Sequence, residues 1–215
     1  MLLAFLAAAT LVGGAAAAGP SLRRTTAGNK RAKASLLSAA SLGKGWTASK
    51  PVSGGLQLSC PGWEPSGSGI VETGGASLPS LSQSGVIIGQ MTSVYASAGQ
   101  ADTLWRRAVK PGLLGCVRQA LEAVSSVPNE KITVKVLSQG PLAITKVGPY
   151  TAGYRVVGEL TSKQNKLKTY FDVILVGRAA TLSEITVSSF VDPVPAEVEY
   201  ALAKIVYRQI GLPVG

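Results

Sequence analysis

The sequence predicts an α+β protein: an antiparallel β-sheet packed by N-terminal, central broken and C-terminal helices and closed by one disulfide. Three observations carry this prediction. An apolar strand at residues 85–97 runs directly into a helical stretch at residues 98–124. Closely spaced strands with short turns fill residues 132–190, and an amphipathic segment follows at residues 193–212. With 46% hydrophobic residues, the chain can bury a full core.

The central stretch organises the chain. The strand at residues 85–97 has apolar residues on both faces, which predicts a central strand or one covered on both sides. The helix that follows is broken at Pro111, because proline lacks the amide donor that a helix interior needs. The helix resumes at residues 113–124 with apolar residues three and four apart, so Cys116 is expected to face inward.

Before this stretch, residues 32–42 predict a short helix, which Gly43 and Gly45 end. Trp46 is expected at the edge of the core. A short strand is expected at residues 56–60 and another at residues 70–73. The Gly- and Ser-rich residues 62–84 otherwise predict an irregular strand or a mobile flap.

After the central stretch, four strands are expected to form an antiparallel meander, at residues 132–137, 154–161, 167–176 and 180–190. The final helix opens after Asp192, and proline is tolerated in its first turn. Its periodicity predicts a buried side made of Val198, Ala201, Leu202, Ile205, Val206 and Gln209.

The first 18 residues contain no charge and end in small residues, which predicts a secretory signal peptide cleaved near Ala17 or Ala18. No Lys or Arg precedes the apolar run, so an uncleaved N-terminal anchor and a segment with neither role remain alternatives. We expect a basic flexible linker at residues 19–31 and a single domain at residues 32–213. The expected location is extracellular or in the cell envelope.

The net charge of +10 is concentrated near the N-terminus, where seven bases precede the first acid, Glu64. A basic arm beside a membrane attracts anionic lipid. The candidates for such a contact are Arg23, Arg24, Lys30, Arg31 and Lys33. The alternative is a soluble tether. Nucleic acid is not an expected partner, because the rest of the chain has no basic stripe with interleaved aromatic residues.

The chain has two cysteines, Cys60 and Cys116. In an exported chain they most simply form a disulfide, which would stabilise the fold by roughly 4 kcal/mol. Two free buried thiols are the alternative. A redox-active pair is not expected, because the Cys-x-x-Cys spacing is absent.

The chain has no histidine, which excludes Ser-His and Cys-His nucleophile pairs and the usual zinc sites. We therefore expect no catalytic residue, no metal and no cofactor, and hence no enzyme. A carboxylate-based hydrolase is a remote alternative. Asp172 lies between Phe171 and Val173 in an apolar strand, and it either faces water or is buried.

A ligand groove is expected between the sheet and the broken helix, or at the flap of residues 62–84. Its candidate lining residues are Trp63, Tyr95, Tyr150 and Tyr154. Trp63, in a Pro-Gly loop, is the best candidate for an exposed aromatic side chain. Core packing is the alternative for such residues, and it is the expected role of Trp105.

Three segments resemble exported sensor-like domains of actinobacterial cell envelopes. They are LLSAASLGKGW at residues 36–46, VYASAGQA at residues 94–101 running into the helix of Cys116, and the closing helix at residues 195–212. The family comprises PknH-type kinase extracellular domains and related lipoproteins with a PsbP/Mog1-like sandwich. The resemblance implies a binding or sensor-like module without catalytic activity, for an unknown small ligand or envelope component. A membrane-tethered structural or interaction protein that uses the basic arm is the alternative.

Overall fold

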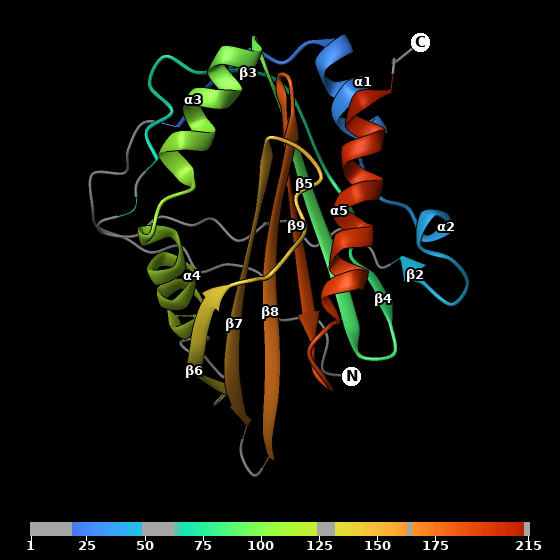
Figure 1. Cartoon of the computed structure of the whole chain (residues 1–215), viewed down its shortest axis with the longest axis vertical. Helices are drawn as coiled ribbons and strands as arrows, with labels where there is room; N and C mark the ends of the chain where they lie inside the picture. The colour runs from blue at the N-terminus through green and yellow to red at the C-terminus, as the bar shows by residue number, and fades with distance from the viewer. Residues whose placement is uncertain (1–18, 49–62, 64, 124–131, 163–164, 213–215) are drawn as a thin grey trace.

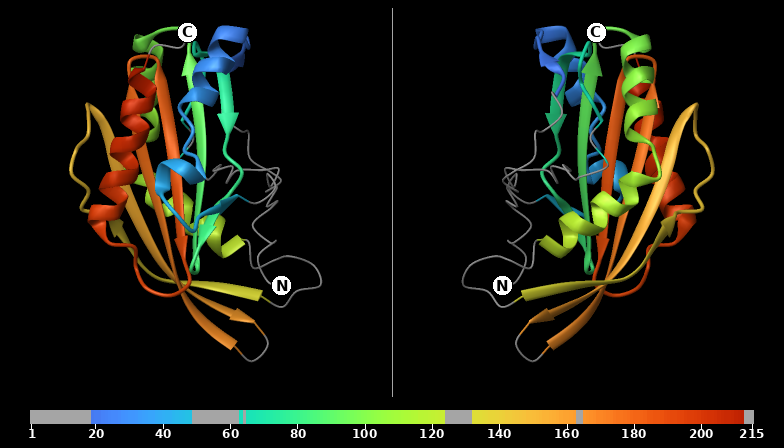
Figure 2. Two further views of the ribbon diagram at one scale, coloured as in Figure 1. Left: turned by 90° about the vertical axis from the view of Figure 1, so that its right-hand side faces the viewer. Right: turned by 90° about the vertical axis from the view of Figure 1, so that its left-hand side faces the viewer.

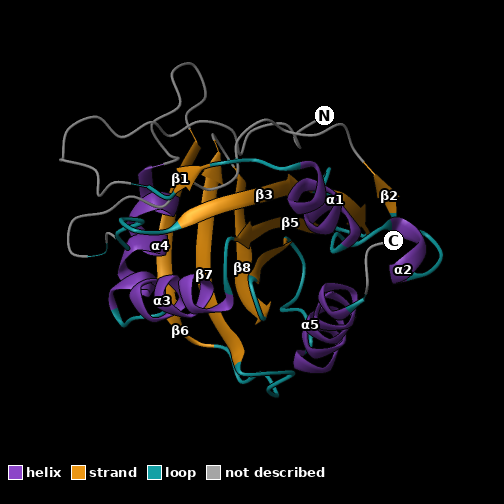
Figure 3. Ribbon diagram, turned by 90° about the horizontal axis from the view of Figure 1, so that it is seen from above, coloured by secondary structure: helices purple, strands orange, loops and turns teal. Residues whose placement is uncertain are grey.

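The computed structural model describes residues 19–48, 63, 65–123, 132–162 and 165–212. A nine-stranded sheet has the order β1-β3-β5-β9-β8-β7-β6, with β4 paired to β5 and β2 paired to β4. Helices α3 and α4 lie on one side of the sheet, and α5 lies on the other (Figure 3). The α+β class is therefore confirmed.

The second half of the sheet is the predicted meander. Its strands pair in chain order as antiparallel neighbours, and the ribbon of β7 and β8 projects beyond the helices at the end opposite α1 (Figure 2). The strands are β6 (Ile132–Pro141), β7 (Tyr150–Ser162), β8 (Asn165–Arg178) and β9 (Thr181–Ser189).

The central strand and broken helix are also confirmed. Strand β5 (Val86–Tyr95) pairs with β9 on one side and with β3 and β4 on the other. Helix α3 (Ala98–Ala108) begins where the Ser97 side chain accepts a hydrogen bond from the amide of Gln100. Helix α4 (Gly112–Ala123) follows the break (Figure 1). Cys116 faces inward and is buried, as predicted.

The predicted flexible linker is wrong. Residues 21–22 form β1 (Ser21–Leu22), which pairs with the edge of β3, and the pair is parallel, so the sheet is mixed rather than purely antiparallel. Helix α1 (Thr26–Ala34) starts directly afterwards, because the Thr25 hydroxyl accepts a hydrogen bond from the amide of Gly28. The basic N-terminal segment is therefore part of the folded domain.

The single helix predicted at residues 32–42 is divided into α1 and the short α2 (Ala39–Leu42). A buried glutamine explains the break. The Gln90 side chain accepts a hydrogen bond from the Leu37 amide at 2.7 Å and donates one to the Ser35 carbonyl at 2.9 Å. These tertiary bonds satisfy backbone groups that a continuous helix would have paired internally.

Much of the predicted flap is regular sheet. It contains β3 (Val71–Ser77) and β4 (Leu81–Gln83), which pair with β5, and β4 also pairs with β2 (Thr47–Ala48). The glycines here serve close packing, because a Cβ on Gly74 would lie only 2.0 Å from the backbone of Gly28 in α1. The strand predicted at residues 56–60 lies outside the described residues.

Helix α5 (Ala196–Gly211) covers the face of the sheet opposite α3 and α4, and it packs Leu202, Val206 and Ile210 into the main core. Trp46 packs against the same core, as predicted. The predicted buried side of α5 is partly wrong, because Val198 and Ala201 are exposed and Glu199 is fully buried. An ion pair described below holds the helix in this orientation.

Candidate functional site

Two adjacent hollows lie at the end of the domain that carries α1, and both are lined by Arg31. We call them together the basic hollow. The larger, of about 690 Å³, is lined by Thr25, Thr26, Ala27, Gly28, Lys30, Arg31, Thr73, Val94, Tyr95 and Ala96. The smaller, of about 280 Å³, is lined by Arg31, Arg178, Ala179, Thr181, Ile210, Gly211 and Leu212.

Local structure explains how cations come to line this hollow. The close approach of Gly28 to Gly74 seats α1 on β3, so the basic residues of α1 sit beside the end of β5. The tight turn between β8 and β9 presents Arg178, and Ala179 in that turn has a φ of 50°. The guanidinium of Arg178 lies 5.4 Å from the centre of the Tyr207 ring of α5, which holds it beside the end of that helix.

Two of the cations that line the basic hollow, Arg31 and Arg178, are not neutralised by a carboxylate within the described part of the chain. Neither Arg31 nor Arg178 has a carboxylate within ion-pair distance there, and both side chains are exposed. Glu72, nearby on β3, is already paired with Arg24 at 2.7 Å. The hollow therefore brings together two arginines without carboxylate partners, and guanidinium groups suit an anion.

Tyr95 forms part of the wall of the larger hollow and is mostly buried. Burial and, to a smaller extent, the charge of Glu72 raise the pKa of Tyr95 to about 12. Its hydroxyl therefore stays protonated and neutral at physiological pH. Burial also raises the pKa of the Glu72 carboxyl, while Arg24 opposes that shift.

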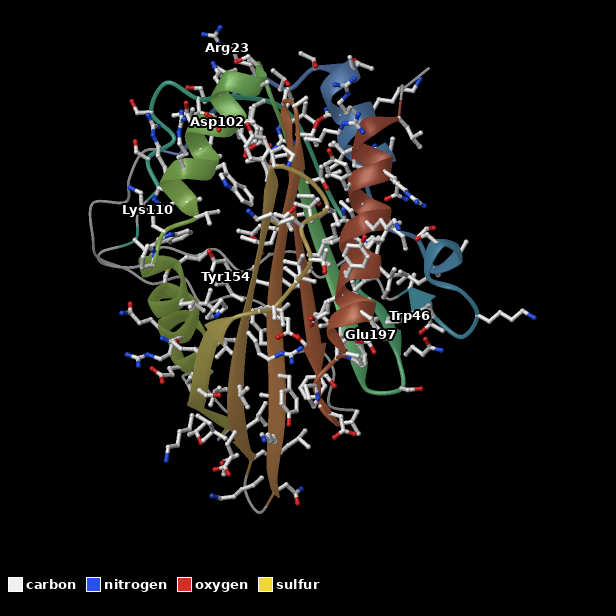
Figure 4. All side chains as sticks on the ribbon, in the orientation of Figure 1. Arg23, Trp46, Asp102, Lys110, Tyr154 and Glu197 are labelled. Atoms are coloured by element: carbon white, nitrogen blue, oxygen red, sulfur yellow. The ribbon has the colours of Figure 1, made fainter. Side chains whose placement is uncertain are left out.

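The four predicted groove residues lie on the sheet face that α3 and α4 cover, but they do not line one groove in the described residues. Trp63 is only 9% exposed, so the expectation of an exposed ring is wrong; its indole N–H donates to the Ala108 carbonyl at 2.7 Å. Tyr150 packs against Trp105 and donates to Asp102 at 3.3 Å. Tyr154 is half-buried against the α4 core (Figure 4). Only Tyr95 reaches the basic hollow.

The five predicted anion contacts all lie on β1, on α1 or in the short link between them. Lys30 and Arg31 line the basic hollow, and Lys33 is exposed in the last turn of α1. Arg23 is exposed at the same end of the molecule (Figure 4). Arg24 is partly neutralised by Glu72. Arg178, far away in sequence, was not predicted and completes the set.

A second charged cluster, also not predicted, lies between the sheet and α5. Arg155 of β7 forms a two-pronged ion pair with Asp172 of β8, at 2.7 and 2.8 Å. It also donates to Glu199 of α5 at 3.0 Å and to the Val194 carbonyl at 2.8 Å. Asp172 is therefore buried, and this settles the alternative that the sequence left open. Arg155 and Asp172 are cross-strand partners on one sheet face, which is the signal that sequence reasoning missed.

The pKa of one acid of this cluster, Glu199, is raised. Burial raises the pKa of Glu199 most strongly, the neighbouring Asp172 raises it further, and Arg155 opposes both. The Oε2 atom of Glu199 has no hydrogen-bond partner among the residues described. An unpaired buried carboxylate oxygen is costly, which favours a neutral Glu199 beside a charged pair of Arg155 and Asp172.

Among the described residues, no helix combines the length and apolar character needed to cross a membrane. Within the same residues, no three acids, cysteines or histidines gather as metal ligands would. Cys60 lies outside the described residues, so its pairing with Cys116 stays a prediction.

No family model and no curated protein matches the chain. Among solved structures, the chain is similar to the extracellular domain of PknH from Mycobacterium tuberculosis, with a TM-score of 0.50 and 12% sequence identity. The match covers 86% of this chain and 97% of that chain. At this identity the likeness concerns the fold alone. The chain thus has an α+β fold like that of the PknH extracellular domain, with a basic hollow at one end.

Proposed function

We propose that the chain is an exported, non-enzymatic binding module of the cell envelope, sensor-like in character, that binds an anionic ligand in the basic hollow. The observation that carries the proposal is the pair Arg31 and Arg178, which line one hollow without a carboxylate partner among the described residues. The uncharged first 18 residues support export, and so does the fold of an extracellular domain.

The chemistry of the lining supports an oxyanion as the ligand. Arginine presents its N–H donors in a planar fork that matches phosphate, sulfate or carboxylate oxygens. Arg31 lies on α1 and Arg178 at the end of β8, and both line the smaller hollow. A small anion bound between them would therefore meet guanidinium donors from two distant parts of the chain.

A non-catalytic role is supported by the state of the acids. Asp172, the acid considered for a carboxylate-based hydrolase, is fully buried and held by Arg155. An acid that is neutralised in the core is a poor general base or nucleophile.

Titration of the full chain with inorganic phosphate and with a soluble phosphate monoester tests the proposal. We expect NMR shifts confined to residues of the basic hollow. We expect the double variant Arg31→Gln, Arg178→Gln to weaken binding by about tenfold or more, because charge-assisted hydrogen bonds are lost. The matched control is Lys44→Gln, which removes an exposed cation outside the hollow. Equal binding by the double variant and the control would refute the anion site.

The disulfide belongs to the same proposal. Trp63, which follows Cys60 by three residues in the sequence, packs in one buried cluster with Cys116, and this supports the proposed link. Mass spectrometry after alkylation, with and without reductant, tests it. We expect alkylation of the cysteines only after reduction and unfolding. Modification of Cys60 in the unreduced protein would contradict the link.

A further inference from the structure

Exposed apolar side chains accompany the cations at the end of the domain that carries α1. Leu22, on β1 and next to Arg23, is 64% exposed. Leu212, which follows α5 and lines the smaller hollow, is 60% exposed. Exposed leucines among lysines and arginines are typical of surfaces that bind at the interface of an anionic membrane. There the leucines are removed from water and the cations are attracted to the lipid head groups.

The chain connection points to the same partner. The Ala-rich apolar run ends at residue 18, and β1 begins at Ser21, where it is hydrogen-bonded to β3. An extended residue spans at most about 3.6 Å, so only about 10 Å of chain separates that segment from the folded sheet. A segment retained in the membrane would hold this end of the domain at the lipid head groups. The predicted flexible linker would have left the orientation free.

We propose that this end of the domain docks on a membrane surface of anionic lipids, with lipid phosphates entering the basic hollow. The docking surface consists of Leu22, Arg23, Lys30, Arg31, Arg178 and Leu212. The inference rests on the proposed function, because it names the lipid head group as the anion. A basic residue near an anionic leaflet raises partitioning roughly fivefold, and the gain fades beyond a Debye length of about 10 Å.

Vesicle co-sedimentation of the full chain tests the charges. One set of vesicles is phosphatidylcholine alone, and the other also contains phosphatidylglycerol. We expect stronger partitioning to the anionic vesicles and a loss of about tenfold or more with Arg31→Glu, Arg178→Glu. Lys44→Glu makes the same change of sign away from the docking surface and is expected to lose no more than about threefold. All three proteins carry residues 1–18, so insertion of that segment contributes equally to each.

The orientation is tested with a pair of tryptophan variants and brominated anionic lipids. Leu22→Trp places a ring on the docking surface, and Leu167→Trp places one at the opposite end, near the start of β8. Both side chains are exposed, so neither change disturbs the core. We expect bromine to quench the added fluorescence of the first variant and to spare that of the second. Equal quenching of the two would overturn the orientation.

The two proposals fail separately. If phosphate shifts the residues of the hollow but the charge-reversed variant still partitions like Lys44→Glu, the membrane inference is wrong and the soluble-anion function stands. If vesicles bind as expected but free phosphate causes no shift in the hollow, docking stands and the small-ligand function is wrong. Thermal melting of every variant confirms that a loss of binding is not a loss of folding.

Discussion

Two clusters of cations in this domain differ in how their charge is balanced. Arg155, between the sheet and α5, meets Asp172, Glu199 and a backbone carbonyl. Arg31 and Arg178, at the end with α1, line an open hollow and have no acid in ion-pair distance among the described residues. The two groups of arginines therefore differ in their surroundings. Arg155 pairs with acids that are buried, whereas Arg31 and Arg178 are exposed to water at the hollow for which we propose an anionic ligand.

The physical reason lies in the cost of removing a charge from water. A buried charge without a partner costs several kcal/mol, so the interior tolerates the Asp172 carboxylate only with Arg155 beside it. An exposed charge keeps its hydration and costs little, whether or not it is paired. Uncompensated cations can therefore persist at the surface, where Arg31 and Arg178 lie.

Removing Arg155 gives the largest expected effect. Arg155→Ala leaves the buried carboxyls of Asp172 and Glu199 without their cationic partner and releases α5 from the sheet. We expect a loss of about 3–5 kcal/mol in the free energy of unfolding, measured by urea denaturation. The control is Arg106→Ala, which removes an exposed pair with Asp102 and should cost less than about 1 kcal/mol. Similar losses for both would remove the distinction between the two kinds of charge.

The second-largest loss of stability is expected from disrupting the buried, uncharged hydrogen-bond cluster around Gln90. Gln90 bonds to Leu37, Ser35, Thr92 and Ser183, all in the interior. Gln90→Ala leaves a backbone amide and a carbonyl without partners, so we expect a loss of about 2 kcal/mol in urea denaturation. Gln83→Ala is the matched control, because its one side-chain bond, to the Lys44 carbonyl, is exposed. A cost for Gln90→Ala no greater than for Gln83→Ala would show that the cluster does not hold α1 in place.

The buried acids predict how stability depends on pH. The folded-state pKa of Glu199 lies above its ordinary value, and burial raises that of Glu184 to about 7, although part of its side chain is accessible. For an acid with a raised pKa, the folded state holds a proton that the unfolded state has released, so stability falls as pH rises. We expect a loss of about 1 kcal/mol between pH 5 and 7 in urea denaturation.

Two variants assign this slope. Glu199→Gln mimics the protonated acid and should flatten the dependence, whereas Glu159→Gln changes an exposed acid paired with Lys166 and should leave it unchanged. Stability that rises over this pH range in the unaltered protein, or an unchanged slope in Glu199→Gln, would contradict a neutral Glu199 in the core.

Local patterns predicted the parts of the fold that depend on local physics. Pro111 marks the break between α3 and α4, and the spacing of short polar turns marks the meander of β6 to β9. Both signals act through neighbouring residues: a missing amide in one case and strand alternation in the other. The inward direction of Cys116 followed from helical periodicity in the same way.

The remainder depends on contacts between distant residues. Gln90 lies in the middle of β5, and its side chain bonds to the backbone of Leu37 just after the end of α1. The polar N-terminal segment becomes ordered as β1 because it pairs with β3. Glu199 is buried because two strands supply Arg155 and Asp172, and periodicity alone placed Val198 inside instead. Arg31 and Arg178 line one hollow although they are far apart in the sequence. Arg31 was therefore predicted as an anion contact, whereas Arg178 was not.

Neutralising one cation of the hollow should have the smallest effect on stability. Arg31→Gln removes an exposed charge with no ion pair in the described residues, so we expect a change within about 0.5 kcal/mol in urea denaturation, and a gain is as acceptable as a loss. The same variant should weaken anion binding measurably. A residue whose loss affects binding but not folding serves a partner, whereas a large destabilisation would mean that Arg31, like Arg155, is part of the framework.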